Sequence, residues 1–167
     1  LLREAREVLL HDRAERRLNN LNYFKKVKVT NEPGSAPDRI VLNVDVEEKS
    51  TGNFSIGGGY STNQGWLAEL SVVETNLMGR GQYARAAVQY GEFAKGVELS
   101  FAEPYFLGYR VGAGVDLFMK ETQASTYILY NIDTVGANFR LSFPLSEEIA
   151  IGPRYSIYQQ ELTLPQD

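Results

Sequence analysis

The feature of this sequence that most constrains its fold is a strict alternation of apolar side chains with small or charged ones. It is clearest between Asn53 and Arg85, a stretch that reads as three strands. Successive side chains of a strand point to opposite faces of a sheet. Each strand is therefore predicted to have one apolar face and one small or charged face, as in the second strand, where Trp66, Ala68, Leu70 and Val72 alternate with Glu69 and Ser71.

The same alternation continues almost to the end of the chain and predicts about seven antiparallel strands. The later segments are residues 97–102, 110–120, 134–143 and 149–158. Antiparallel neighbours turn at alternate ends, so connections 76–82, 103–109 and 144–147 are predicted at one rim and 62–65, 92–95 and 121–133 at the other. Pro153 lies on the apolar side of the last segment and indicates an edge or a bulge.

The first part of the chain has helical spacing instead. Asp12 and Glu15 fit a capping box, and apolar residues at 14, 18 and 21 share one helix face. Asn22 suits the end of this helix because asparagine tolerates the left-handed conformation.

Two strands are predicted to follow, at residues 23–30 and 39–48, joined by a loop at 31–38 that contains Pro33 and Gly34. A helix with two antiparallel strands makes a small α+β layer. Residues 50–52 read as a joint, so the predicted domains are 1–49 and 50–167.

Composition excludes several kinds of function. The net charge of −4 and the lack of a basic run argue against nucleic acid. The absence of cysteine excludes disulfides and thiolate metal sites. Gly57–Gly59 lies inside a strand pattern and does not open a helix, so it is a poor phosphate loop. No metal, nucleotide, flavin or other cofactor is expected.

On each strand, one face is apolar and the other carries glycines and charged residues. This pattern favours a transmembrane β-barrel with a water-filled lumen over a soluble sheet. A soluble antiparallel sheet or lipocalin-like barrel is the alternative, and it would enclose the apolar residues. The aromatic side chains at 60, 66 and 90 resemble a girdle at a lipid–water boundary, and the segments are long enough to cross hydrocarbon when tilted. The predicted lumen charges are Glu69, Arg85, Glu98, Arg110, Asp116, Arg140 and Arg154.

Seven strands do not make a bacterial barrel, which uses an even number, and an open edge cannot face lipid. We therefore expect the chain to be a fragment, or to depend on further strands.

Four sequence blocks resemble the BamA family of outer-membrane β-barrel assembly factors. They are RRLNNLNYFKKVKV (16–29), VLNVDVEEKSTGNFSIGGGYST (41–62), ETNLMGRGQ (74–82) and FAEPYFLG (101–108). The sequence of these blocks resembles that of α-proteobacterial members, although Asn22 stands where the family usually has glycine. The resemblance implies the last half of a membrane-proximal POTRA domain in the periplasm, followed by strands one to seven of a sixteen-stranded outer-membrane barrel.

The resemblance also implies a non-enzymatic insertase that folds nascent outer-membrane β-barrel proteins and binds periplasmic assembly lipoproteins. Its lateral gate would lie at the first barrel strand, where client strands pair. Glycine in a barrel strand also serves curvature or close packing, and this alternative stays open. The implied client-pairing residues are Asn53, Phe54, Ser55, Ile56, Gly57, Gly58, Gly59 and Tyr60.

Two rival functions remain from the sequence. An outer-membrane hydrolase would need paired catalytic groups, for which Glu69, Glu98 and Asp116 are the candidates, since His11 is the only histidine and precedes the helix. A translocation pore, as in the TamA or two-partner secretion relatives, would share the architecture.

Overall fold

A computed structural model describes residues 14–35, 39–62, 65–146 and 149–164. The chain divides into two compact units, Leu1–Thr51 and Gly52–Asp167, and the division falls inside the predicted joint. Each unit is described by itself. Among the residues described, no helix is both long and apolar enough to cross a membrane.

The first unit contains a helical segment and one β-hairpin. Residues 14–20 are helical, and β1 (Phe24–Pro33) pairs with β2 (Ile40–Glu48) antiparallel. Asn22 has a φ of 59°, the left-handed conformation predicted at this helix end. Its side-chain oxygen accepts a hydrogen bond from the Lys49 ammonium at 2.5 Å, which ties the end of the hairpin to the end of the helix. The predicted capping residue, Asp12, lies outside the described part of the chain.

The predicted loop at residues 31–38 starts too early. The hairpin ladder continues to Pro33, which lies opposite Ile40, and the Gly34 N–H closes the connection by donating to the Arg39 carbonyl at 3.0 Å. Proline is tolerated here because it is the last residue of its strand, where no further ladder donor is needed. Pairing with β2 therefore outweighs the local turn preference of Asn31 and Pro33.

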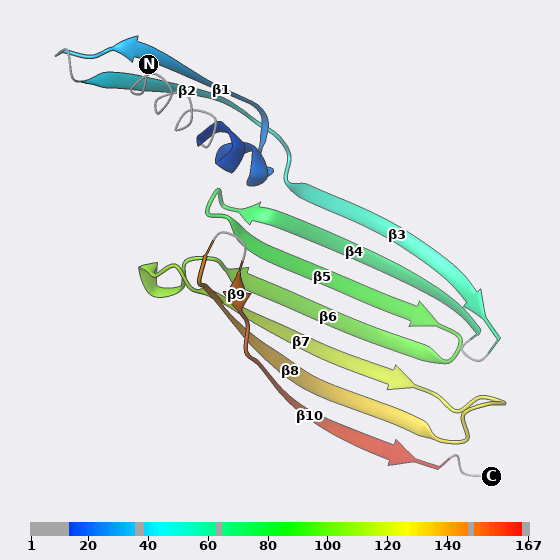
Figure 1. Ribbon diagram of the computed structural model, residues 1–167. Coiled ribbons are helices and arrows are strands. Elements are labelled where there is room, and N and C mark those ends of the chain that lie inside the picture. The colour runs from blue at the N-terminus through cyan, green and yellow to red at the C-terminus, as the bar shows by residue number, and fades with distance from the viewer. Residues whose placement is uncertain (1–13, 36–38, 63–64, 147–148, 165–167) are drawn as a thin grey trace. The chain divides into compact units, whose positions relative to one another are not determined.

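The second unit is one antiparallel sheet in which each main strand pairs with its neighbours in sequence (Figure 1). Its order is β10-β8-β7-β6-β5-β4-β3, and the short β9 pairs with β8. This confirms the prediction of a mainly β chain with antiparallel strands. The strands are β3 (Gly52–Ser61), β4 (Gly65–Leu77), β5 (Gln82–Gly91), β6 (Ala94–Glu103), β7 (Gly112–Thr122), β8 (Asn131–Pro144), β9 (Ala150–Ile151) and β10 (Arg154–Thr163).

Several predicted boundaries were wrong. Strands β4 and β8 have 13 and 14 residues, and the connection predicted at 121–133 shortens because Thr122 pairs with Ile132. The last predicted strand is divided at Gly152 and Pro153, as the proline indicated. Its register is kept across the break, because the Pro153 carbonyl still accepts the Leu141 N–H at 3.0 Å.

The sheet has no dry core on either side. The face that carries the row Ile56, Leu70, Val88, Val97, Met119 and Val135, called the apolar face, is open: Leu70 and Leu117 are 44% and 49% exposed. The opposite, polar face carries the less exposed residues, including Ser71 at 5%. This differs from a soluble sheet, in which apolar side chains are enclosed, and it favours the membrane alternative.

Two aromatic side chains pack closely around one glycine on the polar face. Phe118, Gly136 and Tyr158 lie in one row across β7, β8 and β10. An ideal Cβ on Gly136 would lie 2.7 Å from the Phe118 ring and 2.6 Å from the Tyr158 Cβ. Only glycine leaves room for both neighbours, which pins the register of these strands.

We therefore expect Gly136→Ala to destabilise the complete protein by about 1–3 kcal/mol, because the added methyl group overpacks this row. The matched control is Gly59→Ala, also on the polar face, where an added Cβ meets nothing within 4 Å. Urea midpoints, followed by the gel mobility of unheated samples, measure both. Equal midpoints for the two variants would contradict the packing assigned to Gly136.

Candidate functional site

The free long edge of β3 is the first candidate site. Strand β3 pairs with β4 from Gly52 opposite Glu74 to Ser61 opposite Gly65, and within the described residues it has no second strand neighbour. An edge strand presents a row of N–H and C=O groups that another strand can pair with. All eight residues predicted for client pairing, Asn53 to Tyr60, lie on this edge strand.

The glycines of β3 are not required by close packing in this sheet. Gly57 and Gly59 lie on the polar face, and a Cβ on either would meet nothing within 4 Å. Gly58 lies on the apolar face, where a Cβ would be 3.4 Å from the Leu67 carbonyl, an ordinary contact. None of the three has a left-handed φ. Curvature remains as the structural alternative to a role at the edge.

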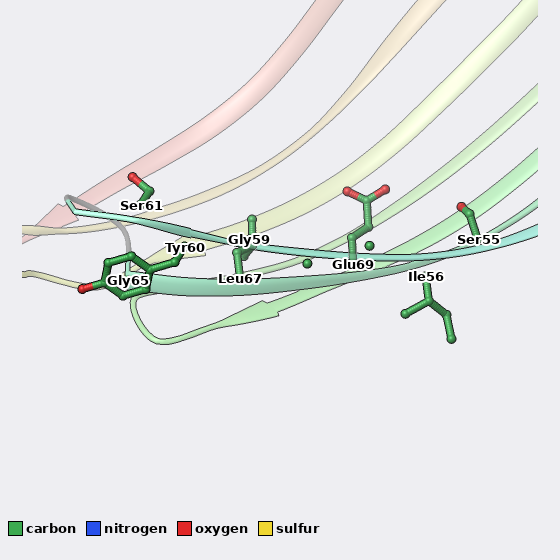
Figure 2. A pocket seen from close by; sticks show the side chains of 10 residues that line it. Ser55, Ile56, Gly59, Tyr60, Ser61, Gly65, Leu67 and Glu69 are labelled. Atoms are coloured by element: carbon green, nitrogen blue, oxygen red, sulfur yellow. The ribbon is translucent and has the colours of Figure 1, made fainter.

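A hollow of about 420 Å³ runs along this edge strand. It is lined by Ser55–Ser61, Gly65, Leu67 and Glu69. Figure 2 shows Ser55 and Glu69 on one side of the strands and Ile56 on the other. The hydroxyls of Ser55 and Ser71 are hydrogen-bonded at 2.6 Å, so the polar face of β3 is held to β4 beside the hollow.

Charged side chains on the polar face form a short ladder across β4, β5 and β6. The Arg85 guanidinium donates to Glu69 at 3.0 Å and to Glu98 at 2.9 Å, and Gln89 donates to the second Glu69 oxygen at 2.8 Å. The sequence pattern did not single out Gln89, although its polar parity and its register opposite Glu69 could have done so. The ladder spans three strands and leaves Glu69 bound through both of its oxygens.

The other predicted lumen charges are placed differently. Arg140 donates to Asp116 at 2.8 Å across β7 and β8. Arg154 lies directly opposite Arg140 in the ladder. Arg110 is exposed in the connection before β7, so it is not part of the strand row in which it was expected.

A hydrolytic site is not assembled among these groups. The three candidate carboxylates are each bound to an arginine, an arrangement that holds them as ion pairs. In the part of the chain that the structure describes, no group of three or more His, Cys, Asp or Glu residues could hold a metal ion. His11 lies outside that part.

Comparison with known proteins gives a consistent result. Residues 76–167, more than half of the chain, match the Omp85 superfamily domain. The outer membrane protein assembly factor BamA of Neisseria meningitidis is 32% identical over 140 residues, which are 81% of this chain and 18% of that protein. The proteins of the same name from Neorickettsia risticii and Nitratidesulfovibrio vulgaris are 26% and 27% identical, over 86% and 90% of this chain and 19% of each relative.

The fold has a match among solved structures. The crystal structure of BamA from Haemophilus ducreyi lacking POTRA domains 1–3 matches with a TM-score of 0.75 at 22% identity, over 90% of this chain and 29% of that one. The chain thus spans about a fifth of the length of the three relatives. These matches place it in the outer membrane, as predicted. The chain belongs to the Omp85 superfamily.

Proposed function

We propose that the protein is an outer-membrane protein assembly factor, and that β3 is the strand on which client β-barrel proteins are folded. The observation that carries this proposal is the run of three glycines in β3, which pairs only with β4 among the described residues, beside a hollow on a sheet whose apolar face is exposed. The names of the three relatives support the general role.

The two faces of the sheet suit two different solvents. In a membrane barrel the apolar face contacts hydrocarbon and the polar face contacts the water of the lumen. The exposed side chains of Leu70, Val88 and Leu117 would then be covered by lipid. At one rim Trp66 and Tyr90 pack with ring centroids 5.8 Å apart, as amphipathic rings do at the headgroup boundary. The Arg85 ion pairs would line the wet side.

Glycine makes β3 a weak partner for the strand that would close the barrel against it. Each glycine in a strand costs roughly 0.5–1 kcal/mol relative to alanine, because it loses more backbone freedom and adds no side-chain contact. A seam built on Gly57–Gly59 therefore opens at a lower cost than the fully paired strands β4 to β8. Once open, β3 offers its N–H and C=O groups to a client strand by β-augmentation.

The first unit is proposed to be the last half of a POTRA domain on the periplasmic side. Its helix and hairpin fit the end of such an α+β layer. Among the described residues β2 pairs only with β1. We propose that clients and assembly lipoproteins bind there, with β2 as the edge that accepts an added strand.

Cysteine cross-linking tests the pairing role of β3. The described chain has no cysteine, so Ser55→Cys can be introduced into a cysteine-free form of the complete protein. We expect it to form disulfides with a cysteine on the terminal strand of a stalled client barrel, because both side chains would lie on the same face of paired strands. Non-reducing gels measure the product.

The matched control is Ser100→Cys, which lies on the polar face of β6 between two paired neighbours. It has no free edge to offer and should trap no client. Trapping at Ser100 equal to that at Ser55 would show that clients enter the lumen without pairing to β3, as expected of a translocation pore.

The double variant Gly57→Val/Gly59→Val tests whether glycine matters for gating. A Cβ added at either position meets nothing within 4 Å, and β-branched residues favour strands. We expect the seam to become more stable and client assembly to slow by about fivefold or more, since about 1 kcal/mol of added seam stability corresponds to that factor. Assembly of a reporter barrel in liposomes measures the rate.

The control is Ser100→Val, which adds a valine on the polar face of β6, between two paired strands and away from the seam, and should leave the assembly rate unchanged. A double variant that assembles clients at the normal rate, while its seam resists opening in a disulfide-trapping assay, would remove glycine from the mechanism. Curvature would then be the reason for Gly57 and Gly59.

A further inference from the structure

The apolar face carries a notch near the rim where the β4–β5 and β6–β7 connections lie. Phe101, Val115, Phe139 and Tyr155 form one row across β6, β7, β8 and β10. The 3₁₀ turn η1 (Phe106–Gly108) contributes Phe106 to the same cavity. The notch has a volume of about 480 Å³, within the range of roughly 300–1,000 Å³ that is typical of small-molecule pockets. Most of its lining residues are apolar, chiefly Phe101, Phe106, Val115, Phe139, Leu141 and Tyr155, and Glu103, Arg140 and Arg154 also border it.

The connection that carries Phe106 is held in place by hydrogen bonds. One Glu103 oxygen accepts the Tyr105 N–H at 2.9 Å and the other accepts the Gln82 amide at 2.6 Å. The Phe106 N–H donates to the Val111 carbonyl at 2.9 Å, which closes the turn. These bonds hold the backbone that places Phe106 beside the notch.

The turn also contains a strained residue beside Phe106. Leu107 has a φ of 55°, a backbone conformation that bulky L side chains rarely adopt. Leu107 is itself 79% exposed and does not line the notch. The strain is a cost of the turn that sets the position of Phe106, and strain of this kind tends to persist at binding sites.

We propose that this notch is a binding site for one acyl chain of a membrane phospholipid. The inference rests on the proposed placement of the apolar face against lipid. The notch is continuous with that face. Arg140 and Arg154 border it but belong to the polar face by their register, and both Glu103 oxygens already accept hydrogen bonds. The rest of its lining is apolar, so an acyl chain fits it. Phe106 gives the chain contacts on a further side, which the open face cannot give, so the bound lipid should exchange slowly.

Photo-cross-linking of the complete protein in phospholipid nanodiscs tests this. The probe is phosphatidylethanolamine with a diazirine in one acyl chain, and labelled residues are located by mass spectrometry. Before photolysis one sample is washed with unlabelled lipid. We expect Val97 and Leu117, in the middle of the apolar face, to lose their label on washing, while Phe101 and Phe139 keep it.

Phe106→Ala should reduce the wash-resistant label at Phe101 and Phe139 by about fivefold or more, because it removes one wall of the site. Phe106→Leu should restore most of it. The matched control, Leu107→Ala, changes the neighbouring exposed residue and should leave the label unchanged.

Label at Phe101 that washes away as fast as label at Leu117, or that Phe106→Ala leaves intact, overturns the acyl-chain site. Absence of label at Val97 and Leu117 as well, even unwashed, would instead overturn the lipid placement.

Discussion

Backbone pairing is the interaction on which the rest of this structure depends. The sheet has no enclosed core, and among the described residues no large side chain is fully buried. The ladders from β3 to β10 therefore hold the strands in register. In a membrane each unpaired N–H or C=O group costs several kcal/mol, so pairing dominates the energetics. A strand that is weakly paired is consequently the place where such a sheet opens at the lowest cost.

Side-chain contacts on the two faces of the sheet add to the backbone pairing. On the polar face, Arg85 joins Glu69 and Glu98 across three strands, and Gly136 admits two aromatic neighbours. These contacts select one register among those that the backbone alone would permit. The strand β3 has fewer such contacts, with open space above Gly57 and Gly59. The proposed gate is thus the place where side chains add least to the ladder.

Much of the fold can be predicted from the sequence, because the alternation of side chains is visible within each strand by itself. Alternation at residues 66–72 and 84–90 assigns both the strand and its face without knowledge of any partner. Boundaries were less accurate, because they depend on partners. Asn31 and Pro33 have turn preferences, but pairing with β2 extends β1 over them. Thr122 pairs with Ile132 inside a stretch that was predicted to be a loop.

The sequence by itself determined the antiparallel strands, the separation of apolar from polar side chains and the family resemblance. These depend on the chemistry of neighbouring residues along the chain. Only the tertiary structure decided which charges meet, that Arg110 lies outside the strands, and that Phe106 forms a wall of a notch with Phe101 and Phe139. Such contacts join residues that are far apart in the sequence, so their geometry is set by strand register and turn conformation, which no local pattern contains.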